Sequence, residues 1–135
     1  MNILVLCTGN SCRSQIAEGY LRHFAGDKAT IYSAGIETHG VNPKAIQVMA
    51  EDDIDISNHT SNNVDEYTGI NFDYVITVCD NAKENCPYFP TLAKKIHQNF
   101  PDPAKAKGDA DEIINEFRKV RDLIKNWSIQ LVKQL

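Results

Sequence analysis

The N-terminal strand–loop–helix segment most constrains how this chain can fold. Residues 2–6 form a nearly continuous apolar run, of the kind found in a buried parallel strand. A polar loop rich in Gly, Asn and Ser follows over residues 7–13. From about residue 14, apolar side chains recur at helical spacing, and Gly26 is placed to end that helix. A buried strand that leads directly into a helix indicates an α/β fold.

The same alternation of strands and helices continues through the rest of the chain. Three further strands are expected, around residues 30–33 with the end at Gly35, at residues 72–78 and at residues 94–99. Helices are expected after Asn42 and Pro43, an N-cap and a first helical residue, and after Asp109, which precedes Glu112 as in a capping box. A short helical turn is expected near residues 64–67. The pattern predicts an α/β sandwich with a central four-stranded parallel sheet.

Length and composition are those of an ordinary single-domain protein. The 135 residues are 42% hydrophobic and 24% charged, so we expect one domain over residues 1–135. The formal net charge of −4 argues against a general nucleic-acid binder but is compatible with a small anionic ligand. The apolar start lacks the features of a signal peptide, and no apolar run is long enough to span a membrane. We therefore expect a monomeric cytoplasmic protein that binds neither nucleic acid nor membrane.

Four cysteines carry the reactive chemistry of the chain: Cys7, Cys12, Cys79 and Cys86. In a reducing compartment they are not expected to form structural disulfides. Their spacings, C-x4-C and C-x6-C, differ from the C-x2-C pairs of zinc ribbons. We therefore expect redox or nucleophilic use of these thiols.

The loop between Cys7 and Arg13 is the strongest functional signal. A loop that leads from a strand into a helix N-terminus directs successive backbone N–H groups toward one point, which makes an anion site. Arg13 can hold two anion oxygens in a fork. Gly9 lets the backbone turn where a Cβ would clash, and Asn10 tolerates left-handed geometry or fixes the loop through its amide. We predict that a tetrahedral oxyanion binds to these residues: Thr8, Gly9, Asn10, Ser11, Cys12, Arg13 and Ser14.

Cys7 is the predicted nucleophile of this loop. A helix N-terminus and a nearby cation lower a cysteine pKa from about 8.5 to roughly 3.5–7.5. We therefore expect Cys7 to be a thiolate at neutral pH. Ser14 is expected to donate a hydrogen bond to that thiolate, to cap the helix, or both. Cys12 is expected to pack beneath the loop without a catalytic role.

Two more cysteines and an aspartate follow the later strands. Ligands of parallel sheets bind outside the carboxyl ends of the strands, so Cys7, Cys79 and Asp102 are expected to meet there. Cys79 and Cys86 would serve a thiol–disulfide relay, or else are two inert buried thiols. Asp102 lies in a stiff turn between two prolines. It is either a general acid for a leaving oxygen or a turn aspartate bonded to its own backbone.

The four histidines are not spaced as metal ligands. We interpret all of them as surface or packing residues: His23, His39, His59 and His97. No metal site is predicted from them.

Three segments resemble the thioredoxin-coupled arsenate reductases, a family that shares the fold of the low-molecular-weight protein tyrosine phosphatases. They are CTGNSCRSQ at residues 7–15, YSAGIETHGVNP at residues 32–43 and DISNHTS at residues 55–61. The likeness covers nearly the whole chain and includes Cys79-x6-Cys86-Pro87, Asp102-Pro103-Ala104 and Arg118-x-Val120-Arg121-Asp122. It implies a three-layer sandwich of the phosphatase type.

The resemblance implies a role for each matching residue. Cys7 forms a thiol–arsenate adduct, Arg13 and the loop amides hold the oxyanion, and Asp102 protonates the departing oxygen. Cys79 then attacks Cys7 and arsenite leaves. Cys86 attacks Cys79, and thioredoxin reduces the resulting disulfide. The expected activity is reduction of arsenate, with thioredoxin as reductant, giving resistance to arsenic.

The resemblance also bears on cofactors. None is required for electron transfer, because formation of a disulfide supplies the two electrons that arsenate takes up. Some family members bind a potassium ion beside the loop, and the matching positions here include Asn10, Glu18 and Ser33. Asn62 stands where such members often carry Asp, which removes one negative charge from that place.

The alternative function is that of a low-molecular-weight phosphatase acting on phosphotyrosine or another phosphomonoester. Phosphate and arsenate have the same shape and charge, so the loop and Asp102 would serve either reaction. Cys79 and Cys86 favour the reductase, since a phosphatase needs neither of them.

Overall fold

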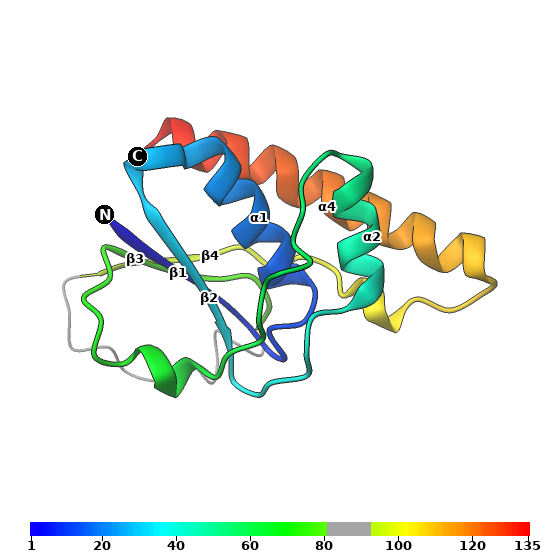
Figure 1. Ribbon diagram of the computed structural model, residues 1–135, viewed down its shortest axis with the longest axis horizontal. Helices are drawn as coiled ribbons and strands as arrows, with labels where there is room; N and C mark the ends of the chain where they lie inside the picture. Colours follow the sequence, from blue (N-terminus) through cyan, green and yellow to red (C-terminus); the bar gives the residue numbers. More distant parts are fainter. Residues whose placement is uncertain (81–92) are drawn as a thin grey trace.

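Four parallel strands form one sheet in the part of the chain that the structure describes. The computed structural model describes residues 1–80 and 93–135 (Figure 1). Within these residues the strand order is β2-β1-β3-β4. The strands are β1 (Asn2–Cys7), β2 (Thr30–Gly35), β3 (Tyr74–Thr77) and β4 (Lys94–His97). All three pairings are parallel, as predicted.

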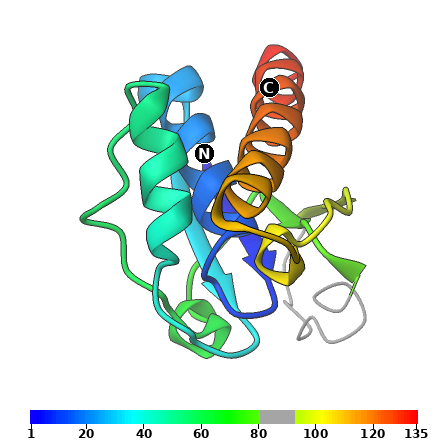
Figure 2. The same ribbon diagram turned by 90° about the vertical axis from the view of Figure 1, so that its right-hand side faces the viewer.

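Three α-helices gather on one side of the sheet (Figures 1 and 2). They are α1 (Arg13–Ala25), α2 (Pro43–Glu51) and α4 (Ala110–Lys133). Three short 3-10 turns complete the described elements: η1 (Gly26–Lys28), η2 (Val64–Tyr67) and η3 (Pro103–Lys105). α1 packs on β1 and β2, and α4 packs on α1 and α2. No helix within the described residues has the length and apolarity needed to cross a bilayer.

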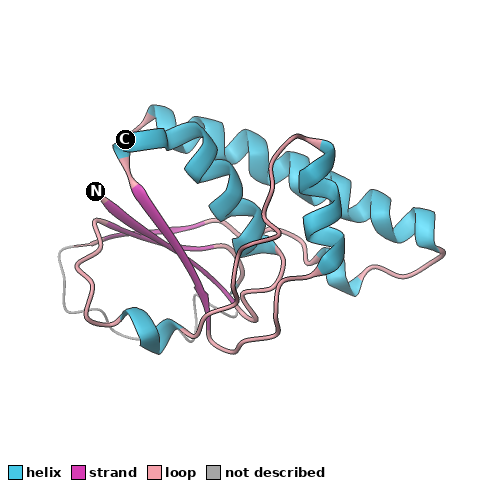
Figure 3. Ribbon diagram, in the orientation of Figure 1, coloured by secondary structure: helices cyan, strands magenta, loops and turns pink. Residues whose placement is uncertain are grey.

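The opposite face of the sheet is covered by the η2 segment (Figure 3). Tyr32 of β2 packs edge-on against Tyr67 and Phe72, with ring centroids 5.3 and 5.5 Å apart. Because both faces of β1 are covered, its residues 3–6 are fully buried. The predicted α/β sandwich is therefore confirmed, and in the described part of the chain a short turn with its flanking loops forms the layer opposite the helices.

The helix ends follow the predicted capping residues. Gly26 ends α1 with a positive φ of 53°, which glycine adopts without a steric penalty. The Asn42 side chain accepts the N–H of Lys44 at the start of α2. Asp109 accepts the N–H of Glu112 at the start of α4, over 2.8 Å.

Two strands are shorter than predicted, whereas β2 runs to Gly35, where its end was expected. β4 ends at His97 rather than residue 99. β3 begins only at Tyr74 rather than residue 72. The Asp73 carboxylate accepts the backbone N–H of Asn2 over 2.8 Å, which ties the start of β3 to the start of β1.

The carboxyl ends of the strands bring the predicted site residues to one edge. β1 ends at Cys7, and β3 ends at Thr77, two residues before Cys79. The chain leaves β4 at His97 and reaches Asp102 at the start of η3.

Candidate active site

A cavity of about 280 Å³ lies at this edge of the sheet and is lined by most of the predicted site residues. Its walls come from the loop that begins at Cys7, from Arg13 at the start of α1 and from Asp102 and Lys105 of the η3 turn. His39, in the segment between β2 and α2, closes one side. The cavity therefore combines a nucleophile, a fixed cation and a carboxyl group.

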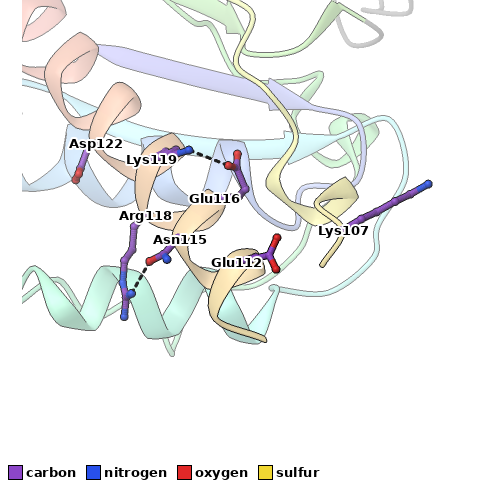
Figure 4. A pocket seen from close by; sticks show the side chains of 7 residues that line it. All are labelled: Lys107, Glu112, Asn115, Glu116, Arg118, Lys119 and Asp122. Carbon is purple, nitrogen blue, oxygen red and sulfur yellow. Dashed lines mark hydrogen bonds and ion pairs between the residues drawn. The ribbon is translucent and has the colours of Figure 1, made fainter. Parts of the chain in front are cut away.

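A larger depression of about 530 Å³ runs along α4 and contains none of the predicted site residues (Figure 4). Its lining is an amide with three cations and three anions: Asn115, Lys107, Arg118, Lys119, Glu112, Glu116 and Asp122. Lys119 pairs with Glu116 at 3.1 Å, and Arg118 donates to Asn115. Because its charges balance and it holds no nucleophile, we assign it no chemistry.

The loop of residues 7–13 holds its carbonyl groups outward. Backbone N–H groups of residues 36, 37, 39 and 42 bind the carbonyl oxygens of Cys7, Thr8, Gly9 and Ser11, at 3.3, 2.9, 3.0 and 2.9 Å. The Gln15 side chain binds the carbonyl of Asn10 at 3.1 Å. In a trans peptide the C=O and the next N–H point in opposite directions, and the described chain has no cis peptide bond. The loop N–H groups therefore point away from these carbonyl partners, and the anion nest stays a prediction.

Asn10 fixes the loop in both of the predicted ways. Its φ is 47°, in the left-handed region. Its buried side-chain amide donates to the hydroxyls of Ser14 and Ser33, at 2.8 and 3.0 Å. Its side-chain oxygen accepts the backbone N–H of Asn62 at 2.7 Å. Gly9 also meets the expectation of a forbidden Cβ, since a Cβ there would lie 2.5 Å from the His39 ring.

Arg13 and Asp102 face each other across the cavity. Nη2 of Arg13 lies 3.6 Å from Oδ2 of Asp102, and Nη1 donates to the carbonyl of Phe100 at 3.1 Å. The other carboxylate oxygen of Asp102 accepts the N–H of Ala104 at 3.0 Å. The alternative of a turn aspartate bonded to its own backbone is therefore confirmed. The other oxygen faces Arg13, and the role of general acid stays a prediction.

Cys7 and Cys79 meet through their side chains. A hydrogen bond joins the two thiols, and Thr8 Oγ1 lies 3.3 Å from Cys79 Sγ. Both cysteines are buried, and neither forms a disulfide. The fold thus brings together two thiols 72 positions apart in the chain. Cys86, the third predicted relay residue, lies outside the described residues.

The predicted lowering of the Cys7 pKa is wrong for this arrangement. The hydrogen bond with Cys79 raises the pKa of Cys7, and burial raises it further. The Arg13 charge and the backbone N–H of Ser14 lower the pKa of Cys7, as expected, but their effect is smaller than that of Cys79 and burial. In this geometry Cys7 is therefore a protonated thiol that shares its hydrogen bond with its neighbour.

Cys12 and Ser14 are placed differently from each other. Burial, followed by the charge of Asp102, raises the pKa of Cys12 to about 12, so its thiol stays protonated at neutral pH. Ser14 does not cap α1, whose N-cap is Cys12 without a side-chain hydrogen bond. The contact of Ser14 with Cys7 is made by its backbone N–H, while its hydroxyl accepts from Asn10.

A buried polar network lies behind the loop and contains the three positions matched to potassium binding. Ser33 donates to the Glu18 carboxylate and accepts from Asn10. Arg22, one turn along α1, pairs with the Glu18 carboxylate at 2.9 Å. Nε2 of His59 lies 3.6 Å from the same carboxylate. Within residues 1–80 and 93–135, no group of three or more His, Cys, Asp or Glu side chains is arranged to hold a metal ion.

The four histidines have different surroundings. His23 is exposed, as predicted. His59 belongs to the buried network and His97 bonds to Asp80, next to Cys79, so both pack in a way the prediction allowed. His39 lines the cavity, which the prediction missed. Its only signal in the sequence was its position within the motif of residues 32–43.

Comparison with known proteins places this geometry in a family. Residues 2–135 match the sequence profile of the low molecular weight phosphotyrosine protein phosphatases. The chain belongs to this family. A solved low molecular weight protein tyrosine phosphatase from T. tengcongensis, 23% identical, has the same fold, with a TM-score of 0.82 over 100% of this chain and 99% of that one.

Within the family, this chain is similar to arsenate reductases. It is 53% identical to arsenate reductase 2 of Staphylococcus saprophyticus over 90% of this chain and 88% of that protein. It is 49% identical to the arsenate reductase of Bacillus subtilis over 92% of this chain and 89% of that protein. A solved arsenate reductase in its phosphate-binding state, 30% identical, superposes with a TM-score of 0.85 over 98% and 97% of the two chains.

Proposed function

We propose that this protein is an arsenate reductase that converts arsenate to arsenite through a relay of cysteine thiols. The observation that carries the proposal is the hydrogen bond between the Cys7 and Cys79 thiols, beside a loop built to hold a tetrahedral anion. Relatives about half identical to this chain are named arsenate reductases, which supports the same reaction here.

In the first step, arsenate binds in the nest with its oxygens toward the loop N–H groups and the Arg13 guanidinium. The Cys7 thiol passes its proton to an arsenate oxygen that stays bound and its sulfur attacks arsenic, while one arsenate hydroxyl group leaves as water. Asp102, whose carboxyl group lines the same cavity, supplies the proton to that oxygen. The product is a Cys7 S–As(V) adduct, and no electron has yet been transferred.

In the second step, the Cys79 sulfur attacks the Cys7 sulfur, as in any thiol–disulfide exchange. The S–S bond forms, the S–As bond breaks, and its electron pair stays on arsenic, which leaves as arsenite. The two thiols have together lost two electrons, the number that As(V) gains in becoming As(III). The thiols need little approach for this step, because they already share a hydrogen bond.

Cys86 completes the proposed cycle by attacking Cys79 and freeing Cys7 for the next arsenate. The Cys79–Cys86 disulfide is then reduced by thioredoxin, which restores the three thiols. Such a cycle needs a reducing compartment, so we propose that the protein acts in the cytoplasm. We also propose that it acts as a monomer with one domain over residues 1–135.

The residues matched to potassium binding do not fit a bound cation here, and no step is derived through one. The charge of Glu18 is already paired with Arg22 over 2.9 Å. Asn10 turns the donor end of its amide toward Ser33, whereas a cation needs oxygen. We therefore expect the same turnover in sodium and potassium salts at equal ionic strength.

The test is NADPH consumption by this protein with arsenate, thioredoxin and thioredoxin reductase, measured beside hydrolysis of p-nitrophenyl phosphate. We expect arsenate-dependent NADPH consumption with arsenite as product, and at most weak hydrolysis of the ester. Efficient ester hydrolysis without NADPH consumption would instead identify a phosphatase.

A further inference from the structure

His39 and Glu37 form a pair beside the anion loop that the proposed mechanism does not use. Nε2 of His39 lies 2.8 Å from a carboxylate oxygen of Glu37. The backbone N–H groups of the same two residues bind the carbonyls of Gly9 and Thr8, at 3.0 and 2.9 Å. The segment that shapes the outer side of the loop therefore also places an ionisable ring against it.

The His39 ring forms part of the cavity wall at Gly9. A Cβ built on Gly9 would lie 2.5 Å from Nδ1 of His39, so this nitrogen is the ring atom that faces the loop. The same ring lines the cavity that contains Cys7 and Arg13. His39 therefore borders the space in which an anion would bind.

The hydrogen bond with Glu37 determines which nitrogen of the neutral ring carries the proton. A carboxylate can only accept, so Nε2 must be the N–H group. The neutral ring then presents the lone pair of Nδ1 toward the anion site, which disfavours an anion there. When the ring takes up a second proton, Nδ1 becomes a donor and the ring adds a positive charge to the site.

Resting on the proposed function, we infer that His39, oriented by Glu37, is a further anion-binding residue, and that oxyanion binding is coupled to protonation of its Nδ1. The other ionisable groups that face the cavity are Arg13, Asp102 and Lys105, together with the thiols of Cys7 and Cys12.

Sulfate is the probe that tests this coupling, because it is a tetrahedral dianion whose charge does not change near neutral pH. Its affinity for the reduced full-length chain would be measured by calorimetry between about pH 5.5 and pH 8.5, a range that spans an ordinary histidine pKa. We expect wild-type affinity to fall about tenfold across this range, since one unit charge near a partly exposed dianion is worth about that factor.

Matched variants separate His39 from other groups. The sulfate affinity of His39→Gln should vary less than about twofold over this pH range. It should equal the affinity that the wild type shows at the alkaline end of the range. Glu37→Gln should reduce the slope, because the ring loses the carboxylate that orients it. His23→Gln, which changes an exposed histidine on α1, should keep the tenfold slope. Circular dichroism would verify that each variant is folded.

Retention of the full slope in folded His39→Gln, or a flat wild-type profile, would overturn the inference. The outcome is separable from that of the proposed function. A protein that fails to reduce arsenate but shows the His39-dependent slope refutes only the proposed function. A protein that reduces arsenate and shows no slope refutes only the role of His39.

Discussion

The outer and inner faces of the loop at residues 7–13 are built in contrasting ways. On the outer face, the carbonyl groups and the Asn10 side chain are bonded to groups of the protein itself, mostly in buried positions. On the inner face, Arg13 and Cys7 make contacts with Asp102 and Cys79, groups that the proposed reaction engages in turn. The difference teaches that the outer bonds hold the nest in shape before a ligand arrives, while the inner contacts can be exchanged for it.

The largest effect should come from the inner face, in Cys7→Ser. Arsenate turnover should fall by a factor of about 10⁶, as for loss of a catalytic nucleophile elsewhere. Binding of inorganic phosphate should persist, because the outward carbonyl bonds that shape the nest do not involve the thiol. NADPH consumption and calorimetry measure the two effects. Loss of phosphate binding in a folded variant would show that the two faces are not independent.

Cys79→Ser and Cys86→Ser should each reduce arsenate turnover by about a thousandfold, since neither can complete the disulfide relay. Their weak hydrolysis of p-nitrophenyl phosphate should stay near that of the wild type, because that reaction needs only the loop and Asp102. Full arsenate turnover in Cys86→Ser would contradict the relay.

The outer face is tested at Asn10, where two variants separate backbone from side chain. Asn10→Ala loses the buried hydrogen bonds and puts Ala at a φ of 47°, so we expect a loss of about 3 kcal/mol in unfolding free energy. Glycine tolerates that φ, so the loss of unfolding free energy in Asn10→Gly should be smaller than in Asn10→Ala by about 1–2 kcal/mol. Urea unfolding measures both variants. Equal losses would mean that the left-handed backbone costs nothing here.

Cys79→Ala should lower the pKa of Cys7, because the hydrogen bond with Cys79 is the largest influence that raises it. Alkylation of Cys7 by iodoacetamide at about pH 7.5 should then accelerate about tenfold, as the thiolate fraction grows. Mass spectrometry of the labelled peptide assigns the modified residue. An unchanged rate would leave burial as the main reason why Cys7 is protonated.

The smallest effect concerns Cys12, which shares the loop with Cys7. The pKa of Cys12 is raised to about 12 in the folded chain, from an ordinary value of 9.0. Its contribution to stability is therefore complete below pH 9 and is lost as the pH rises toward 12. Between about pH 8 and pH 10, the wild type should lose about 1 kcal/mol more unfolding free energy than Cys12→Ser, which cannot ionise. Arsenate turnover of Cys12→Ser should stay substantial.

Much of the architecture was predictable because local patterns agreed with the tertiary structure. The apolar run of residues 2–6 requires burial on both faces, which in turn requires a covered parallel sheet. Capping residues such as Asn42 and Asp109 set the helix starts through contacts within a few residues. The ends of β3 and β4 were less predictable, and at the start of β3 the Asp73 carboxylate instead accepts the backbone N–H of Asn2.

The site was predictable in its composition but not in its electrostatics. The loop residues, Arg13 and Asp102 follow from the order of strand, loop and helix. The sign of the Cys7 pKa shift does not, because it depends on a thiol far away in sequence. The role of His39 as a cavity wall was missed for a similar reason, since its contact with Gly9 exists only once β2 lies beside β1.

By itself, the sequence determined the loop of residues 7–13 with its thiol and its cation, and the α/β sandwich that carries them, because these depend on the periodicity and chemistry of neighbouring residues. Only the tertiary structure decided that Cys79 raises the pKa of Cys7, that Arg22 pairs with Glu18, and that His39 reaches the cavity. Parallel strands place their carboxyl ends side by side whatever their separation in the chain, and burial then makes each such contact strong enough to change the chemistry of its partners.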